Sequence, residues 1–243
     1  MKKDLLYHQI TDHLKSIEKH LCAYSKNKKP KQLHLLRLDI KITKALLSFA
    51  EAVYTAPYST VELKPLFQKA GEIREIQIMV QLISSSDHQP KGLVYQLKKK
   101  ERFLKQQFLN NSSRYIKSIK KFRKGVSLPS KLPEEQTIKT YFDTEWMIAN
   151  QKFENKDREG LHQFRKGIKK LMFIYNALPK KLRKEVELDK ATINKLQEKV
   201  GKWHDTYSAV DFLSRQHFSQ NLVDYISTLE EKERKQFDAL LNH

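Results

Sequence analysis

The sequence predicts an all-α fold of two antiparallel four-helix bundles, about eight helices in all, related by internal duplication. Two observations support this prediction. The 243 residues include only six Gly and seven Pro, and they are rich in Lys, Leu, Gln and Glu, which favours long helices. One amphipathic helix pattern occurs twice, second in each of two runs of four predicted helices. No segment shows the alternation that is typical of a half-buried strand.

The repeated helix pattern spans residues 31–54 and 157–178. Its apolar residues alternate in steps of three and four, which marks one face of a helix. This face consists of Leu161, Phe164, Ile168, Leu171 and Tyr175 in the second copy and, 128 positions earlier, of Leu33, Leu36, Ile40, Thr43 and Leu47 in the first. Both copies therefore predict a helix that buries one stripe of side chains.

Basic residues run beside the apolar face in both copies. The first basic strip consists of His34, Arg37, Lys41 and Lys44, and the second of His162, Arg165, Lys166, Lys169 and Lys170, with Arg158 one turn earlier. Each residue of a helix rises about 1.5 Å, so the first strip runs for about 15 Å along one side. A polyanion along the strip would relieve the repulsion between neighbouring charges. A solvated lysine-rich face would explain a single strip, but the repetition with a leading histidine favours binding.

Turn-forming residues set the boundaries of the other predicted helices. Proline disfavours helix at the residue before it, so Pro30 ends the first helix. The segment 125–133 holds two Pro, one Gly and two Ser, which predicts a break between halves. The chain then divides into a first four-helix repeat at 1–125, a linker at 126–133 and a second repeat at 134–243. The expected helices are 4–24, 31–54, 60–84 and 91–124, then 134–152, 157–178, 189–214 and 217–241.

A second, shorter motif also recurs. Gly71-Glu-Ile-Arg-Glu75 and Gly201-Lys-Trp-His-Asp205 lie 130 positions apart in the third and seventh predicted helices. A glycine inside a helix costs about 1 kcal/mol relative to alanine, so we expect both glycines to allow close helix approach. Arg74 either points toward the first basic strip or pairs with a nearby carboxylate, and the sequence leaves both alternatives open.

Both motifs resemble those of the CHAD family, the conserved-histidine α-helical domains. The family's first signature is a helix with His, then Arg three residues later, then basic residues around a Leu, and the two basic strips match it. Its second signature, L-G-x-x-R-D, is matched around Gly71, with Glu75 in place of Asp, and around Gly201, with His204 in place of Arg. The resemblance covers nearly the whole chain.

The resemblance implies a pair of four-helix bundles whose basic inner surfaces bind inorganic polyphosphate without catalysis. The motif helices of the two halves would then face one another and form a shared basic channel. The binding residues that it implies are His34, Arg37, Lys41, Lys44, Arg74, His162, Arg165, Lys166, Lys169, Lys170 and His204. The sequence departs from the family pattern at Ile42, Thr43 and Met172, which predicts a thinner cationic site.

Composition limits the partners and the chemistry. Lys and Arg number 47 against 28 Asp and Glu, a formal charge of +19, which predicts attraction to polyanions such as nucleic acid, anionic membrane surfaces or polyphosphate. The single Cys22 excludes an internal disulfide framework and a cysteine-rich zinc site.

Glu159 and His162 have the ExxH spacing of di-iron helix bundles, which require two such motifs. Lys31 holds the equivalent place before His34, so we expect no metal and no cofactor. Neither a signal peptide nor a membrane span is evident, which predicts a soluble, cytoplasmic protein.

The basic strips and some other segments have further interpretations. Nucleic-acid binding is the main alternative, although single-strand binding favours aromatic residues among the cations, and the strips alternate with aliphatic ones. A histidine phosphotransfer bundle would place glycine one residue earlier than Gly167. The segment Glu231-Lys-Glu-Arg-Lys235 fits the ExExK motif of triphosphate-tunnel enzymes, but that motif requires a β-strand. A further basic run on the fourth helix favours a solvated face: Arg114, Lys117, Lys121 and Lys124.

Overall fold

The computed structural model describes residues 5–84, 91–186, 188–215 and 220–241. Within these ranges the chain forms ten α-helices, one short 3-10 helix and no strand, so the predicted all-α class is confirmed. None of these helices is both long and apolar enough to cross a membrane. The chain divides into two compact units, residues 1–137 and 138–243, which are described one at a time. The duplication itself stays a prediction.

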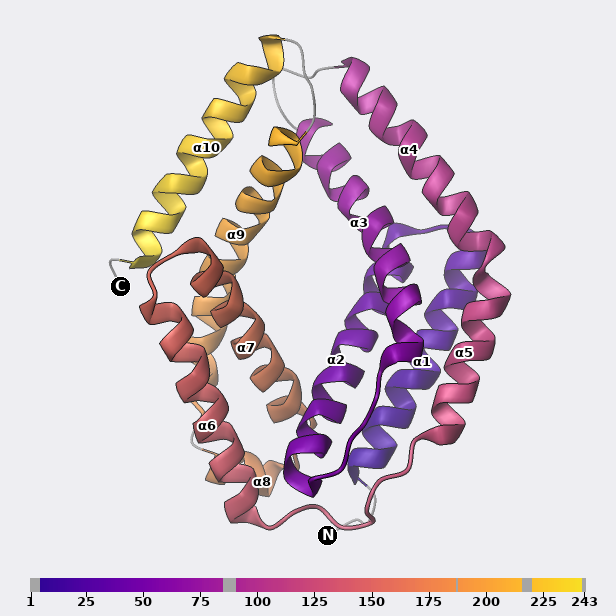
Figure 1. The fold of residues 1–243 in the computed structure, drawn as a ribbon, viewed down its shortest axis with the longest axis vertical. Helices are drawn as coiled ribbons and strands as arrows, with labels where there is room; N and C mark the ends of the chain where they lie inside the picture. Colours follow the sequence, from indigo (N-terminus) through magenta and orange to yellow (C-terminus); the bar gives the residue numbers. More distant parts are fainter. Residues whose placement is uncertain (1–4, 85–90, 187, 216–219, 242–243) are drawn as a thin grey trace. The chain divides into compact units, whose positions relative to one another are not determined.

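Unit 1 contains five α-helices: α1 (Leu5–Asn27), α2 (Pro30–Tyr54), α3 (Lys64–Ser84), α4 (Lys91–Asn110) and α5 (Ser112–Gly125), with the 3-10 helix η1 at Val61–Leu63. Helix α1 packs on α2 and α5, while α3 packs on α2 and α4 (Figure 1). A two-residue connection joins α1 to α2, in which Lys28 has a left-handed φ of 54°. Pro30 is the first residue of α2, where the missing N–H of proline has no intrahelical partner to lose.

The apolar face predicted for the first motif helix is buried, as expected. Leu33, Leu36, Ile40 and Thr43 are fully buried, and Leu47 is 1 % exposed. The Thr43 hydroxyl donates to the Asp39 carbonyl one turn earlier at 2.8 Å, which satisfies the one polar atom in the stripe. Burial of this face fixes the rotation of α2 and so sets the direction in which its basic residues point.

The single helix predicted at 91–124 is wrong, because the chain breaks at Asn111. This residue leaves the helical region at φ −95° and ψ 1°, and its side-chain amide donates to the Gln107 carbonyl at 2.9 Å. On either side of the break, Phe108 packs against Tyr24 at a ring distance of 5.6 Å and against Tyr115 at 5.4 Å. The break lets α4 follow α3 while α5 follows α1 (Figure 1).

Unit 2 contains most of α6 (Glu135–Glu154), then α7 (Arg158–Ala177), α8 (Lys180–Glu185), α9 (Lys190–Ser214) and α10 (Gln220–Leu241). The six-residue α8 was not predicted, because it buries only Leu182 and is too short to show a period. Helix α9 packs on α7 and α10. The core of this unit gathers side chains from α6, α7, α9 and α10: Ala149, Leu161, Phe164, Ile168, Met172, Ile193, Val200, Trp203, Phe237 and Leu240.

A buried carboxylate ties α7 and α9 to α10. Glu233 is only 4 % exposed, and it accepts two hydrogen bonds from Arg158, at 2.9 and 2.7 Å, and one from the Trp203 indole at 2.7 Å. The guanidinium of Arg158 also lies 4.9 Å from the Phe237 ring centroid. Arg158 is therefore neutralised by a carboxylate, and the ExExK segment has a structural role on a helix.

We expect Glu233→Gln to destabilise the protein by about 1–3 kcal/mol, because it removes the charge from a buried acceptor that is shared by Arg158 and the buried Trp203 indole. Urea unfolding followed by circular dichroism measures the change. Glu230→Gln is the matched control, because Glu230 lies on the same helix and is exposed. An equal effect of the two substitutions would contradict the role given to Glu233.

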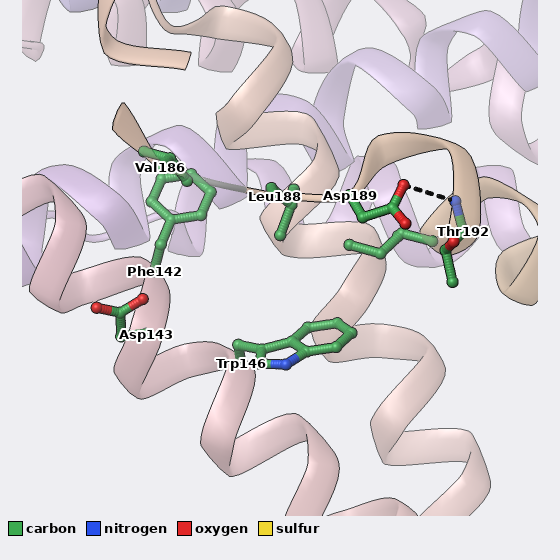
Figure 2. A pocket seen from close by; sticks show the side chains of 8 residues that line it. Phe142, Asp143, Trp146, Val186, Leu188, Asp189 and Thr192 are labelled. Atoms are coloured by element: carbon green, nitrogen blue, oxygen red, sulfur yellow. Dashed lines mark hydrogen bonds between the residues drawn. The ribbon is translucent and has the colours of Figure 1, made fainter. Parts of the chain in front are cut away.

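Unit 2 also contains a pocket of about 240 Å³, lined by Phe142, Asp143, Trp146, Val186, Leu188, Asp189, Thr192 and Ile193 (Figure 2). The Asp189 side chain caps α9 by accepting from the Ala191 and Thr192 amides at 3.1 Å. Two carboxylates in an otherwise apolar lining repel anions, so this pocket does not suit a polyanion.

Candidate polyanion-binding site

The first basic strip lies on α2, and Phe67 of α3 holds its central arginine. Arg37 is half-buried, its Nη1 donates to the Phe67 carbonyl at 2.6 Å, and its guanidinium carbon lies 4.3 Å from the Phe67 ring centroid. The Lys44 ammonium lies 5.7 Å from the same ring. His34 and Lys41 are exposed on the same helix. One cation–π contact and one hydrogen bond thus position Arg37, which forms no ion pair with a carboxylate among the described residues.

Gly71 makes room for this arginine. A Cβ atom at position 71 would collide with the Arg37 Nη1 and would lie 3.2 Å from its Cζ. Gly71 therefore allows the close approach of an arginine side chain to α3, whereas the sequence predicted the close approach of another helix. Gly201 has no such neighbour within 4 Å, so the same expectation is wrong there.

Arg74 lies near the first strip. Burial lowers the pKa of Arg37, the Glu75 carboxylate opposes that shift, and the Arg74 charge adds to it. Arg74 itself forms no ion pair with any carboxylate in the part of the chain that the structure describes. The structure thus brings Arg37 and Arg74 into one group, with Glu75 as the nearby compensating charge.

The second basic strip meets α9 through a pair of histidines. The rings of His162 and His204 are stacked, with centroids 4.9 Å apart and planes inclined by 18°. Arg165 and Lys169 are half-buried on the same side of α7, and burial lowers the pKa of both. Asp205 opposes these shifts. The structure therefore groups His162, Arg165 and Lys169 with His204 and Asp205.

Two polar atoms of this group are buried without a hydrogen-bond partner among the described residues. They are Nδ1 of His162 and Nε of Arg165. A buried donor without an acceptor is costly, and a phosphate oxygen would supply one to the guanidinium. An anion at the second strip would therefore meet a donor that has no acceptor among the described residues.

His204 has polar neighbours on α9 besides the His162 ring. Its Nδ1 lies 3.3 Å from the Ser208 hydroxyl and 4.0 Å from an Asp205 carboxylate oxygen. The His204 imidazole, followed by the Arg165 and Lys169 charges, holds the pKa of Asp205 below its usual range. His204 and Asp205 of α9 thus lie beside the cations of α7. In unit 1, Arg74 and Glu75 of α3 lie in the same way beside the cations of α2.

Not all of the second strip points the same way. The Lys170 ammonium pairs with Glu145 of α6 at 2.8 Å and lies 5.5 Å from the Tyr141 ring centroid. The structure therefore does not bring Lys170 together with Arg165 and Lys169. Lys166 is exposed and remains beside His162, whose pKa it helps to lower.

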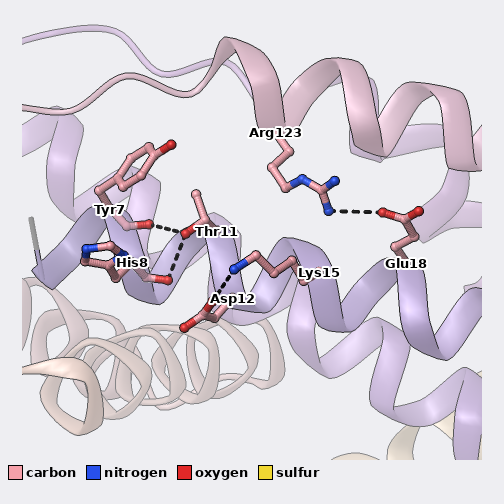
Figure 3. Close-up of polar contacts among 7 residues, drawn as sticks. All are labelled: Tyr7, His8, Thr11, Asp12, Lys15, Glu18 and Arg123. Atoms are coloured by element: carbon pink, nitrogen blue, oxygen red, sulfur yellow. Dashed lines mark hydrogen bonds and ion pairs between the residues drawn. The ribbon is translucent and has the colours of Figure 1, made fainter.

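The basic run of the predicted fourth helix falls on α5, where Arg114, Lys117, Lys121 and Lys124 are all exposed. Between them, Lys120 pairs with Glu18 of α1 at 3.2 Å. Arg123 pairs with the same carboxylate at 3.0 Å (Figure 3). These ion pairs fix α5 to α1.

Phe67 was missed by sequence reasoning, although one signal could have found it. It lies four residues before Gly71, so the ring and the glycine share one face of α3. No group of three or more His, Cys, Asp or Glu side chains among the described residues could hold a metal ion.

The fold and these groups define an all-α, strongly basic protein with two clusters of arginine, lysine and histidine, on α2–α3 and α7–α9, each built around a partly buried arginine. Comparison with known families gives the more particular assignment. The family model of the CHAD domain matches residues 8–214, and the chain belongs to this family.

Solved structures show the same fold. The crystal structure of the CHAD domain from the plant Ricinus communis matches with a TM-score of 0.65 and 15 % identity, over 100 % of this chain and 86 % of that one. PptA from Streptomyces chartreusis matches with a TM-score of 0.64 and 10 % identity, over 99 % and 96 %. No curated protein matches the chain.

Proposed function

We propose that this protein binds inorganic polyphosphate without catalysis, through the basic strips of α2 and α7. The observation that carries the proposal is the state of Arg37 and Arg165. Both are partly buried, and neither forms an ion pair with a carboxylate in the described ranges. The Phe67 carbonyl and ring hold Arg37, whereas Arg165 has a buried Nε without a hydrogen-bond partner. Membership of the CHAD family supports the same ligand, because that resemblance implies polyphosphate binding.

The arrangement suits a chain of phosphates for two physical reasons. An arginine that is already positioned loses little side-chain entropy when it binds, and its planar fork matches phosphate oxygens. The lysines of both strips add point charges along the helix axis, where successive phosphates of an extended chain would lie. Binding should therefore be electrostatic and multivalent.

Titration with polyphosphate of increasing chain length, at two salt concentrations, tests the proposal. We expect the affinity to rise with chain length and to fall as salt is added, because each neutralised phosphate releases counterions. Equal, weak binding of short and long chains would contradict it.

We also expect the affinity for polyphosphate to rise as the pH falls below about 6.5, the ordinary pKa of histidine. Burial and then the His204 ring, with Lys166 and Arg165, hold the pKa of His162 below that value, while Glu159 opposes them. The ring is therefore neutral at pH 7, and protonation at lower pH adds a positive charge to the second strip. A bound anion favours the charged ring and raises its pKa.

Titrations at a series of pH values measure this effect, and His162→Gln is the variant that removes it. The variant should lose the part of the pH dependence that lies below neutrality while it keeps its affinity at pH 7.5 within a few-fold. A pH profile that is the same in both proteins would place the titrating group elsewhere.

A further inference from the structure

The outer face of α4 combines exposed aromatic rings with cations. Tyr95 is 65 % exposed and Phe103 is 61 % exposed, and they are the two aromatic residues among the large hydrophobic side chains exposed in the described part of the chain. Lys99 lies between them at i+4 from Tyr95, and Arg102 lies beside Phe103. These four residues share one face of the helix.

The opposite face of α4 carries the buried apolar residues and the one glutamate of the helix. Leu97 and Phe108 are buried, and Glu101 pairs with Lys105 at 2.6 Å and accepts from Gln77 of α3 at 3.0 Å. The only carboxylate of α4 is therefore engaged on its inner side. Four exposed cations of the helix form no ion pair within the described ranges: Lys98, Lys99, Lys100 and Arg102.

This combination points to one class of ligand. Polyphosphate has no apolar surface and gains nothing from an aromatic ring, and a duplex hides the faces of its bases. A membrane surface requires a broad apolar face, whereas two rings here alternate with Lys99 and Gln106. Unpaired bases stack on aromatic side chains while nearby cations neutralise the backbone. Tyr95 and Phe103, eight residues apart, place two stacking surfaces about 12 Å apart along the helix.

We propose that the outer face of α4, consisting of Tyr95, Lys99, Arg102 and Phe103, binds single-stranded nucleic acid. This site is separate from the basic strips, since α4 contributes none of their residues. On this face of α4, exposed aromatic residues lie among the cations, whereas the basic strips of α2 and α7 have no exposed aromatic residue of their own helix between their cations. The proposal goes beyond polyphosphate binding and does not depend on it.

The test uses the full chain and a fluorescent oligothymidylate, with binding followed by anisotropy at physiological salt. We expect Tyr95→Gln and Phe103→Gln each to lower the affinity about tenfold, as loss of one base–aromatic stack does. Glutamine preserves helix propensity, and both positions are exposed, so the fold should be unaffected. Met147→Gln is the matched control, because Met147 is 54 % exposed on α6.

Two further ligands make the result specific. Affinities for a duplex of the same length and for polyphosphate should not change in the aromatic variants, since neither ligand offers a free base. Unchanged oligothymidylate binding in these variants would overturn the proposal, as would a parallel loss for all three ligands. Loss of binding to vesicles of phosphatidylserine, with oligothymidylate binding retained, would assign this face to a membrane surface.

Discussion

Replacement of both Arg37 and Arg165 by glutamate is expected to abolish polyphosphate binding and to leave the helicity of the protein intact. Each arginine offers charge-assisted hydrogen bonds, worth about 1.5–3 kcal/mol apiece, and the introduced carboxylates would repel the ligand. The combined loss should exceed about a hundredfold in affinity. The measurement is a titration with long-chain polyphosphate, together with circular dichroism of the free protein.

Net charge alone would give a different result, and a matched control separates the two explanations. Arg114→Glu with Arg234→Glu changes the total charge by the same amount, at exposed positions on α5 and α10. This control should lose only the small, salt-sensitive part of the affinity. If it loses as much as the Arg37 and Arg165 variant, the strips have no special role. The single variants, measured beside the double one, assign the loss to each unit.

Substitution of Gly71 by alanine is expected to lower polyphosphate affinity about tenfold or more, although position 71 itself need not touch the ligand. The added methyl group would collide with the Arg37 guanidinium, which must then leave the Phe67 carbonyl and ring. A guanidinium that is no longer positioned pays more side-chain entropy on binding. The effect should appear in affinity and in the stability of unit 1.

Gly201 provides the matched comparison within the same chain. An alanine there meets nothing within 4 Å, so Gly201→Ala should leave binding unchanged and stabilise the protein by about 0.5–1 kcal/mol. Polyphosphate titration and urea unfolding of both variants measure the difference. Equal effects of the two substitutions on affinity would contradict the role of Gly71 as the space for Arg37.

The helices that carry the site could be predicted because their signal is local. The spacing of the apolar residues Leu33, Leu36 and Ile40 predicts which face of α2 is buried. Helix geometry then places the basic residues beside that face. The break at Asn111 could not be predicted, because no proline or glycine marks it. It depends on the packing of Phe108 between Tyr24 and Tyr115, which are distant from one another in sequence.

The sequence indicated which cations lie on the motif helices, but not which of them pair with carboxylates. Arg37 and Arg165 are at motif positions, whereas the carboxylates that pair with other cations lie outside the motif. Lys170 pairs with a carboxylate 25 residues away. Arg158 pairs with one 75 residues away. Local spacing carries no information about such long-range pairs, so a strip read from sequence includes cations that the fold neutralises. The role of Phe67 was hidden for the same reason, since it acts through the neighbouring helix.

The central claim is that Arg37 and Arg165 hold phosphate, and a structure of the full chain with long-chain polyphosphate tests it most directly. We expect phosphate oxygens within about 3.2 Å of both guanidinium groups, with Lys44 beside the phosphate at Arg37 and Lys169 beside the phosphate at Arg165. Phosphates that contact only the exposed cations of α4 and α5, with both arginines unoccupied, would contradict it.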